Sequence, residues 1–152
     1  MTYEELMIEA DKGLIIKEKP LINNDGRIKG NRIAIRRDIP TLKQKACVLA
    51  EELGHYYTNY GDILDQSITE NRKQELKARA WAYNKQIGLI GIINAYHSHC
   101  HTLYEMADFL EVTEDFLLEA LEYYKGKYGT CIEVDNYIVY FEPVIGVLEK
   151  YK

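Results

Sequence analysis

The segment from Thr41 to Tyr57 constrains the fold most strongly, because it combines a helix start with a helical hydrophobic pattern. Thr41-x-x-Gln44 has the form of a capping box, in which each side chain satisfies a backbone amide at the helix start. Apolar residues then recur at spacings of three and four, which predicts a helix with one buried face. These residues are Ala46, Leu49, Ala50, Leu53 and Tyr57. We expect this helix to end near Gly61.

The polar side of this predicted helix carries residues with the chemistry of a metal site. Glu51 and His55 are four residues apart, so they project from one face of the helix, with Glu52 beside them. This is the geometry of H-E-x-x-H, in which two residues bind a metal and the intervening Glu polarises the bound water. Here Glu51 stands where the pattern has its first His. A carboxylate also binds Zn²⁺, but it donates more charge, which predicts slower hydrolysis or a preference for Mn²⁺.

A third ligand has to come from another element, and Glu75 is the candidate. It lies in a segment over 70–87 that predicts a second long helix, one turn before Ala78. The small side chain of Ala78 permits close packing of this helix against the first. Glu51, His55 and Glu75 could then fill three positions of a tetrahedron and leave the fourth to water, which is the arrangement of catalytic zinc sites.

The rest of the chain predicts an α+β fold in which helices dominate. Thr2-x-x-Glu5 starts a short helix that stops near Gly13, and residues 14–38 form a small antiparallel sheet before the metal-binding helix. Further helices are expected over 88–96, 102–110 and 113–126, followed by a hairpin over 131–141 that turns at Asp135-Asn136. Without a linker or repeat, we expect one domain over 1–152, with a core over about 1–90 and a helical and hairpin part over about 91–152.

The charge balance argues against nucleic acid as a direct partner. Lys and Arg number 19 against 24 Asp and Glu, which gives a net charge of −5. The helix-turn-helix-like segment 103–118 is itself acidic, so we expect it to be a packing unit or a docking face for a basic protein. A stand-alone DNA-binding regulator would need a basic recognition face, and the sequence does not reveal one.

Several features place the protein in the cytoplasm. The three cysteines are odd in number and far apart, which predicts no disulfide framework. The first residues offer no basic stretch followed by an apolar one, so we expect no signal peptide, and the longest apolar run, residues 87–93, is too short to span a membrane. His97, His99 and His101 crowd beside Cys100, but the cap at Thr102 predicts a solvated loop there and not a metal site.

The two predicted helices together resemble the ImmA/IrrE family of metallo-endopeptidases. Ala50-Glu-Glu-Leu-Gly-His55 is similar to the family's H-E-L-G-H, and Glu75-x-x-Ala78-x-x-Trp81-Ala82 is similar to its E-x-x-A-N-x-F-A. The resemblance implies a zincin-like core, a divalent metal bound by Glu51, His55 and Glu75, and Glu52 as the general base. Arg79 stands where the family has Asn.

For family members encoded by phages and mobile elements, the resemblance further implies cleavage of a helix-turn-helix repressor. We therefore expect a zinc-dependent endopeptidase of such an element, acting on a protein substrate in a bacterial cytoplasm. The alternative is a catalytically weak or inactive member that binds a protein partner. The sequence leaves open the oligomeric state and the donor to the oxyanion, for which Tyr56, Tyr57, Tyr60 and the histidines are candidates.

Overall fold

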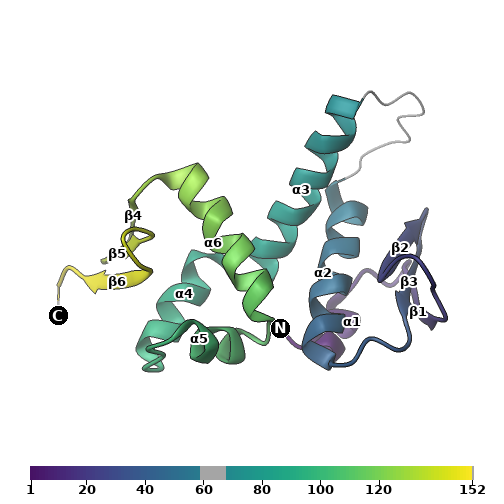
Figure 1. The fold of residues 1–152 in the computed structure, drawn as a ribbon, viewed down its shortest axis with the longest axis horizontal. Helices are drawn as coiled ribbons and strands as arrows, with labels where there is room; N and C mark the ends of the chain where they lie inside the picture. Colours follow the sequence, from purple (N-terminus) through teal and green to yellow (C-terminus); the bar gives the residue numbers. More distant parts are fainter. Residues whose placement is uncertain (59–67, 152) are drawn as a thin grey trace. The chain divides into compact units, whose positions relative to one another are not determined.

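The computed structural model describes residues 1–58 and 68–151 and has an α+β, mainly helical fold (Figure 1). The chain divides into two compact units, Met1–Lys85 and Gln86–Lys152. The predicted helix end at Gly61 lies outside the described residues. The single domain predicted over 1–152 stays a prediction, and the first unit contains all four predicted site residues.

In its described residues, 1–58 and 68–85, the first unit has three helices and one sheet. Its elements are α1 (Tyr3–Glu9), β1 (Ile15–Lys19), β2 (Gly26–Lys29), β3 (Arg32–Arg36), α2 (Leu42–Thr58) and α3 (Ile68–Gln86), of which α3 extends one residue beyond the unit. The predicted capping box at Thr2 is confirmed, although α1 ends at Glu9 and not near Gly13, because the backbone of Ala10 is already extended. The capping box at Thr41 is confirmed too, since Thr41 Oγ1 accepts a hydrogen bond of 3.1 Å from the Gln44 amide.

The sheet of the first unit has the strand order β1-β3-β2. β2 and β3 form the predicted antiparallel hairpin, whereas β1 runs parallel to β3, so the expectation of a wholly antiparallel sheet is wrong for β1. The alternation of apolar and polar residues specifies the faces of a strand but not the direction of its neighbour. On the inner face Ile33 and Ile35 are buried, and α2 packs against β2 and β3.

A partly buried polar link joins three elements of this unit. Glu18 of β1 accepts hydrogen bonds of 3.1 Å from both the Tyr3 hydroxyl and the Lys45 ammonium. The bond from Lys45 keeps the pKa of Glu18 below its usual value. Burial and the nearby carboxylate raise the pKa of Tyr3 to about 12. Through these two hydrogen bonds, α1 and α2 are both joined to strand β1 of the sheet.

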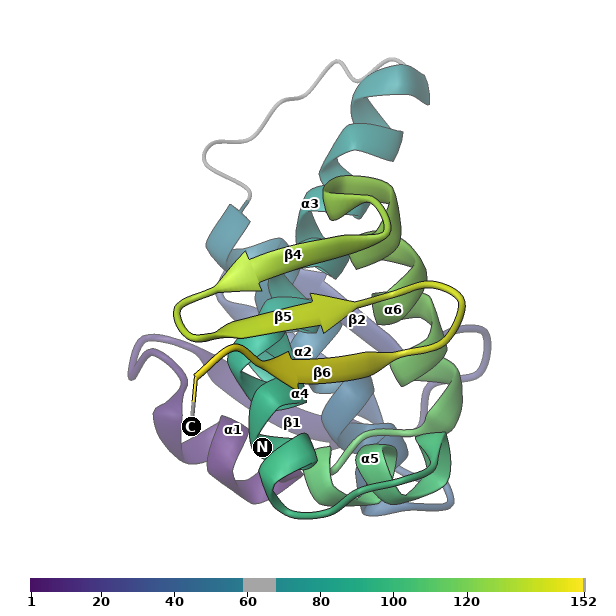
Figure 2. The same ribbon diagram turned by 90° about the vertical axis from the view of Figure 1, so that its left-hand side faces the viewer.

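Over its described residues, 86–151, the second unit contains three helices and a second sheet, and the first and third of these helices contact the sheet. Its elements are α4 (Gly88–His97), α5 (Leu103–Leu110), α6 (Glu114–Tyr128), β4 (Cys131–Val134), β5 (Tyr137–Tyr140) and β6 (Gly146–Glu149). Thr102 and Thr113 cap α5 and α6 as predicted. β4 and β5 form the predicted hairpin, and β6, which was not predicted, adds an antiparallel third strand (Figure 2). Within the described residues, no helix is long and apolar enough to span a bilayer.

Helices α2 and α3 come into close contact at Gly54. A Cβ atom on Gly54 would lie 2.2 Å from the carbonyl oxygen of Ala78, and Ala78 itself is fully buried. Close to this point the ring of Tyr57 stacks on Trp81, with 5.1 Å between the ring centroids. The two helices that carry the predicted ligands are therefore in backbone contact, and only glycine fits at position 54.

We expect Gly54→Ala to lower the free energy of unfolding by at least ~2 kcal/mol, because the new methyl group meets backbone that cannot rotate away. Urea unfolding followed by circular dichroism measures this change. Gly126→Ala in α6 is the matched control, since nothing lies within 4 Å of its added Cβ and removing a helical glycine should stabilise by about 0.5–1 kcal/mol. A Gly54→Ala protein as stable as the wild type would contradict the close approach.

Candidate metal centre

Two of the predicted ligands meet across the interface of α2 and α3. His55 Nε2 lies 3.2 Å from Glu75 Oε2. The imidazole side chain is 20% exposed and the carboxylate 45%, so the pair is open to solvent on one side. Residues from two helices, twenty positions apart in the chain, thus present one nitrogen and one oxygen to the same point.

The spacing of these two atoms fits a divalent cation. Donor atoms that each lie roughly 2.0–2.2 Å from one tetrahedral ion are roughly 3.3–3.6 Å apart. The observed 3.2 Å between His55 Nε2 and Glu75 Oε2 is close to that range. An imidazole with a carboxylate is also a donor set that zinc, manganese and related metals accept. The pair can therefore supply two ligands to one ion with little movement.

The structure does not bring Glu51 into the same cluster. Over residues 1–58 and 68–151, no group of three or more His, Cys, Asp or Glu side chains is arranged to hold one ion. Glu51 lies one helical turn before His55 and influences the neighbouring carboxylate of Glu52. Its role as the first ligand stays a prediction.

Glu52 lies against the backbone of β2. A Cβ atom on Gly26 would lie 2.9 Å from Glu52 Cγ and 3.0 Å from its Oε1, so this glycine leaves room for the carboxylate. Burial, assisted by the negative charges of Glu51 and Glu75, raises the pKa of Glu52 to about 7. The sequence carries no signal for this role of Gly26, which only its position opposite α2 reveals.

Comparison with protein families tests the family resemblance that these residues suggested. Residues 9–122 match the model of the IrrE N-terminal-like domain, a family of metallopeptidases. The chain belongs to the ImmA/IrrE family. Its core is zincin-like, as the sequence predicted. Comparisons with the curated proteins and with the solved structures gave no match.

Arg79 distinguishes this chain from the usual family pattern at the site. Its Nε lies 3.4 Å from Glu75 Oε1, one turn along α3, while the other oxygen of Glu75 faces His55. The carboxylate therefore lies between an imidazole and a guanidinium. A fixed positive charge beside a ligand repels a divalent cation and lowers the electron density that the carboxylate can donate.

The candidate oxyanion donors have other partners in the structure. The Tyr56 hydroxyl donates to Asp11 Oδ2 at 3.2 Å, and the Tyr57 hydroxyl accepts from the Asp11 amide at 3.0 Å. Tyr60 lies outside the described residues. His97 ends α4, where its Nε2 lies 2.7 Å from the Tyr137 hydroxyl, and the following residues form the predicted loop before α5.

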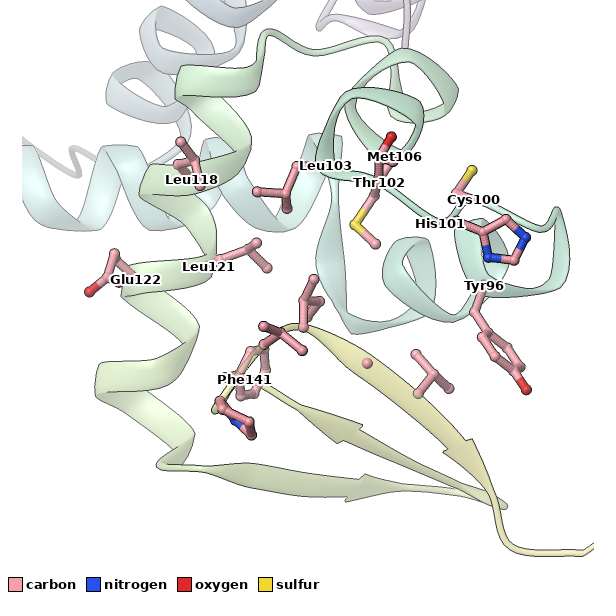
Figure 3. Close-up of a pocket in the computed structure, with 15 residues that line it drawn as sticks. Tyr96, Cys100, His101, Thr102, Leu103, Met106, Leu118, Leu121, Glu122 and Phe141 are labelled. Atoms are coloured by element: carbon pink, nitrogen blue, oxygen red, sulfur yellow. The ribbon is translucent and has the colours of Figure 1, made fainter.

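A cavity of about 530 Å³ lies within the second unit (Figure 3). Its walls come from the loop before α5, from α5 and α6, and from the chain between β5 and β6. Leu103, Met106, Leu121 and Phe141 contribute to a mostly apolar lining. None of the four predicted site residues lines this cavity.

We expect Arg79→Asn, which introduces the usual family residue, to tighten Zn²⁺ binding by roughly ten-fold, because it removes the positive charge beside Glu75. Competition with a chromogenic zinc chelator measures the affinity. Lys77→Asn, on the same helix and exposed, removes an equal charge and should change the affinity less than three-fold. Equal affinities for the wild type and Arg79→Asn would contradict this role of Arg79.

Proposed function

We propose that this protein is a zinc-dependent endopeptidase of a phage or mobile element that cleaves a cognate helix-turn-helix repressor in the bacterial cytoplasm. Membership of a metallopeptidase family gives the general activity and a protein substrate. The observation that carries the proposal is the convergence of His55 and Glu75 at 3.2 Å. Glu52, the proposed base, lies on the same helix as His55 and directly follows Glu51.

The proposed roles follow from the chemistry of each side chain. His55 and Glu75 bind the metal, with Glu51 as the third ligand. A bound divalent cation supplies Lewis acidity for amide hydrolysis. Glu52 takes a proton from the attacking water and returns it to the leaving amine, for which its place between β2 and the ligand pair is suited.

The position of β2 supports a peptide as the substrate. In the described sheet β2 pairs only with β3, so its second edge is available to an extended peptide. Gly26 begins this strand and lies against Glu52. A peptide that paired with β2 would run past the proposed base. The choice of a repressor rests on the likeness to family members of mobile elements.

A second candidate function is a protein-binding regulator that has lost catalysis. The observation in its favour is the guanidinium of Arg79 on Glu75, which competes with a metal for the same carboxylate. Such a protein would keep the fold and recognise its partner through its surface. The two functions make different demands on Glu52.

We expect Glu52→Gln to abolish cleavage of the repressor encoded by the same element, because an amide cannot accept the proton. Zn²⁺ content and the free energy of unfolding should stay within error of the wild type, since the substitution keeps the size of the side chain. Gel electrophoresis of the zinc-loaded protein mixed with purified repressor measures cleavage. Glu4→Gln, on the exposed side of α1, is the matched control and should cleave like the wild type.

The regulator makes the opposite prediction for the same set of proteins. It would leave the repressor intact with the zinc-loaded wild type, while binding it with equal affinity before and after Glu52→Gln. That outcome would reject the endopeptidase and retain the binding function.

A further inference from the structure

The net charge of −5 conceals a strong separation of charge along the chain. Residues 86–152 carry 11 Asp and Glu but only 4 Lys and Arg, whereas residues 1–85 carry 15 Lys and Arg and 13 Asp and Glu. Within the first unit the excess of cations gathers in the sheet: residues 12–37 hold 8 Lys and Arg and only 2 Asp and Glu. The argument from net charge therefore does not apply to the sheet.

The strand register places most of these cations on the outer face of the sheet. Residues paired directly across strands share a face, so Lys17, Ala34 and Arg27 form one row across β1, β3 and β2. In the next row Arg32 lies between Ile15 and Lys29. Lys19 continues the face at the end of β1. The inner face carries Ile33 and Ile35, which are buried.

Five of these side chains have no acidic partner. Over the described residues, no carboxylate lies within 4 Å of the charged group of Lys17, Lys19, Arg27, Lys29 or Arg32. Arg36 differs, because it pairs with Asp25 at 3.0 Å and with Asp38 at 3.3 Å. Like charges on adjacent strands repel each other, so this arrangement costs stability unless an anion covers it.

The same five side chains surround a hollow in the face. Its volume is about 310 Å³, and Ala34 forms part of its floor, between the strands that carry Lys17 and Arg27. A larger side chain at position 34 would fill the hollow. The face therefore combines a small central residue with a surround of five unpaired cations, which suits an anionic group.

The lining of the hollow indicates which anion fits. It contains no aromatic side chain on which an unpaired base could stack, which disfavours single-stranded nucleic acid. It contains no Ser, Thr, Asn or Gln to bond a 2′-hydroxyl, which disfavours duplex RNA. Ile15 is its only exposed large apolar residue, too small an anchor for a membrane surface. The cations also extend over three strands, which is wider than the row that an extended acidic peptide covers.

We propose that the outer face of the β1-β3-β2 sheet, formed by Lys17, Lys19, Arg27, Lys29 and Arg32 around Ala34, binds the phosphate backbone of double-stranded DNA without reading its sequence. This proposal differs from the expectation of no direct nucleic-acid contact, which rested on the charge of the whole chain. The inference is independent of the proposed peptidase activity, because it uses none of the residues of the metal centre.

Fluorescence anisotropy of the full-length protein with a labelled mixed-sequence DNA duplex tests this inference. If five phosphates are neutralised, log K should fall with log salt with a slope of about −4.5, which is about a 500-fold loss between 50 and 200 mM salt. Lys17→Gln with Arg27→Gln should reduce the slope by about 2. Lys125→Gln with Lys127→Gln in α6 removes the same charge from the second unit and should leave the slope unchanged.

Ala34 allows a test in which only charge differs. Ala34→Glu places a carboxylate among the five cations and should weaken DNA binding at least ten-fold more than Ala34→Gln, which adds equal bulk to the hollow without the charge. Thermal unfolding by circular dichroism checks that both proteins fold. If either does not fold, the Lys17 and Arg27 double variant decides.

Competing partners provide the outcomes that would overturn the inference. Duplex RNA, phosphatidylserine vesicles and poly-glutamate are measured under the same conditions. The inference would be refuted if the protein did not bind DNA at 50 mM salt, or if Ala34→Glu and Ala34→Gln changed the DNA affinity equally. Tighter binding of any of the other three probes than of DNA would also refute it and would identify the true partner class.

Discussion

The backbone contact of α2 and α3 at Gly54 is the constraint on which the metal centre depends. Without a side chain at this position, α2 reaches the carbonyl of Ala78, and the helices bring His55 within 3.2 Å of Glu75. The stacking of Tyr57 on Trp81 supports the same contact. A glycine and an alanine thus determine whether two donor atoms from separate helices can share one ion, which explains why the motif carries small residues beside its ligands.

Much of this arrangement could be predicted from the sequence because it depends on local rules. The capping residues at positions 2, 41, 102 and 113 fixed the helix starts, and the apolar spacing gave the buried face of α2. Periodicity could not predict that β1 is parallel to β3, because direction depends on how the connecting chain crosses the sheet. β6 was missed because its four residues begin with a glycine and do not alternate apolar and polar side chains. The role of Gly26 beside Glu52 likewise required the tertiary structure.

The net charge of the whole chain conceals a local excess of cations on the first sheet. The period-two spacing of Lys17 with Lys19 and of Arg27 with Lys29 was present in the sequence, but the strand order that joins these cations and Arg32 into one face was not. Meanwhile cations are scarce in residues 86–152, which carry 4 Lys and Arg against 11 Asp and Glu. The first unit therefore combines a metal-ligand pair, a proposed base and a cationic sheet face, and these features use different residues, so each can be removed separately.

The central claim is that His55 and Glu75 bind one divalent ion together. Zn²⁺ titration by isothermal calorimetry of the metal-free wild type, His55→Ala and Glu75→Gln tests it most directly, with His101→Ala as a control from the exposed loop before α5. The account predicts one equivalent of Zn²⁺ bound by the wild type and the control, and loss of that binding in both site variants. Unchanged binding in His55→Ala and Glu75→Gln, or no binding by the wild type, would contradict it.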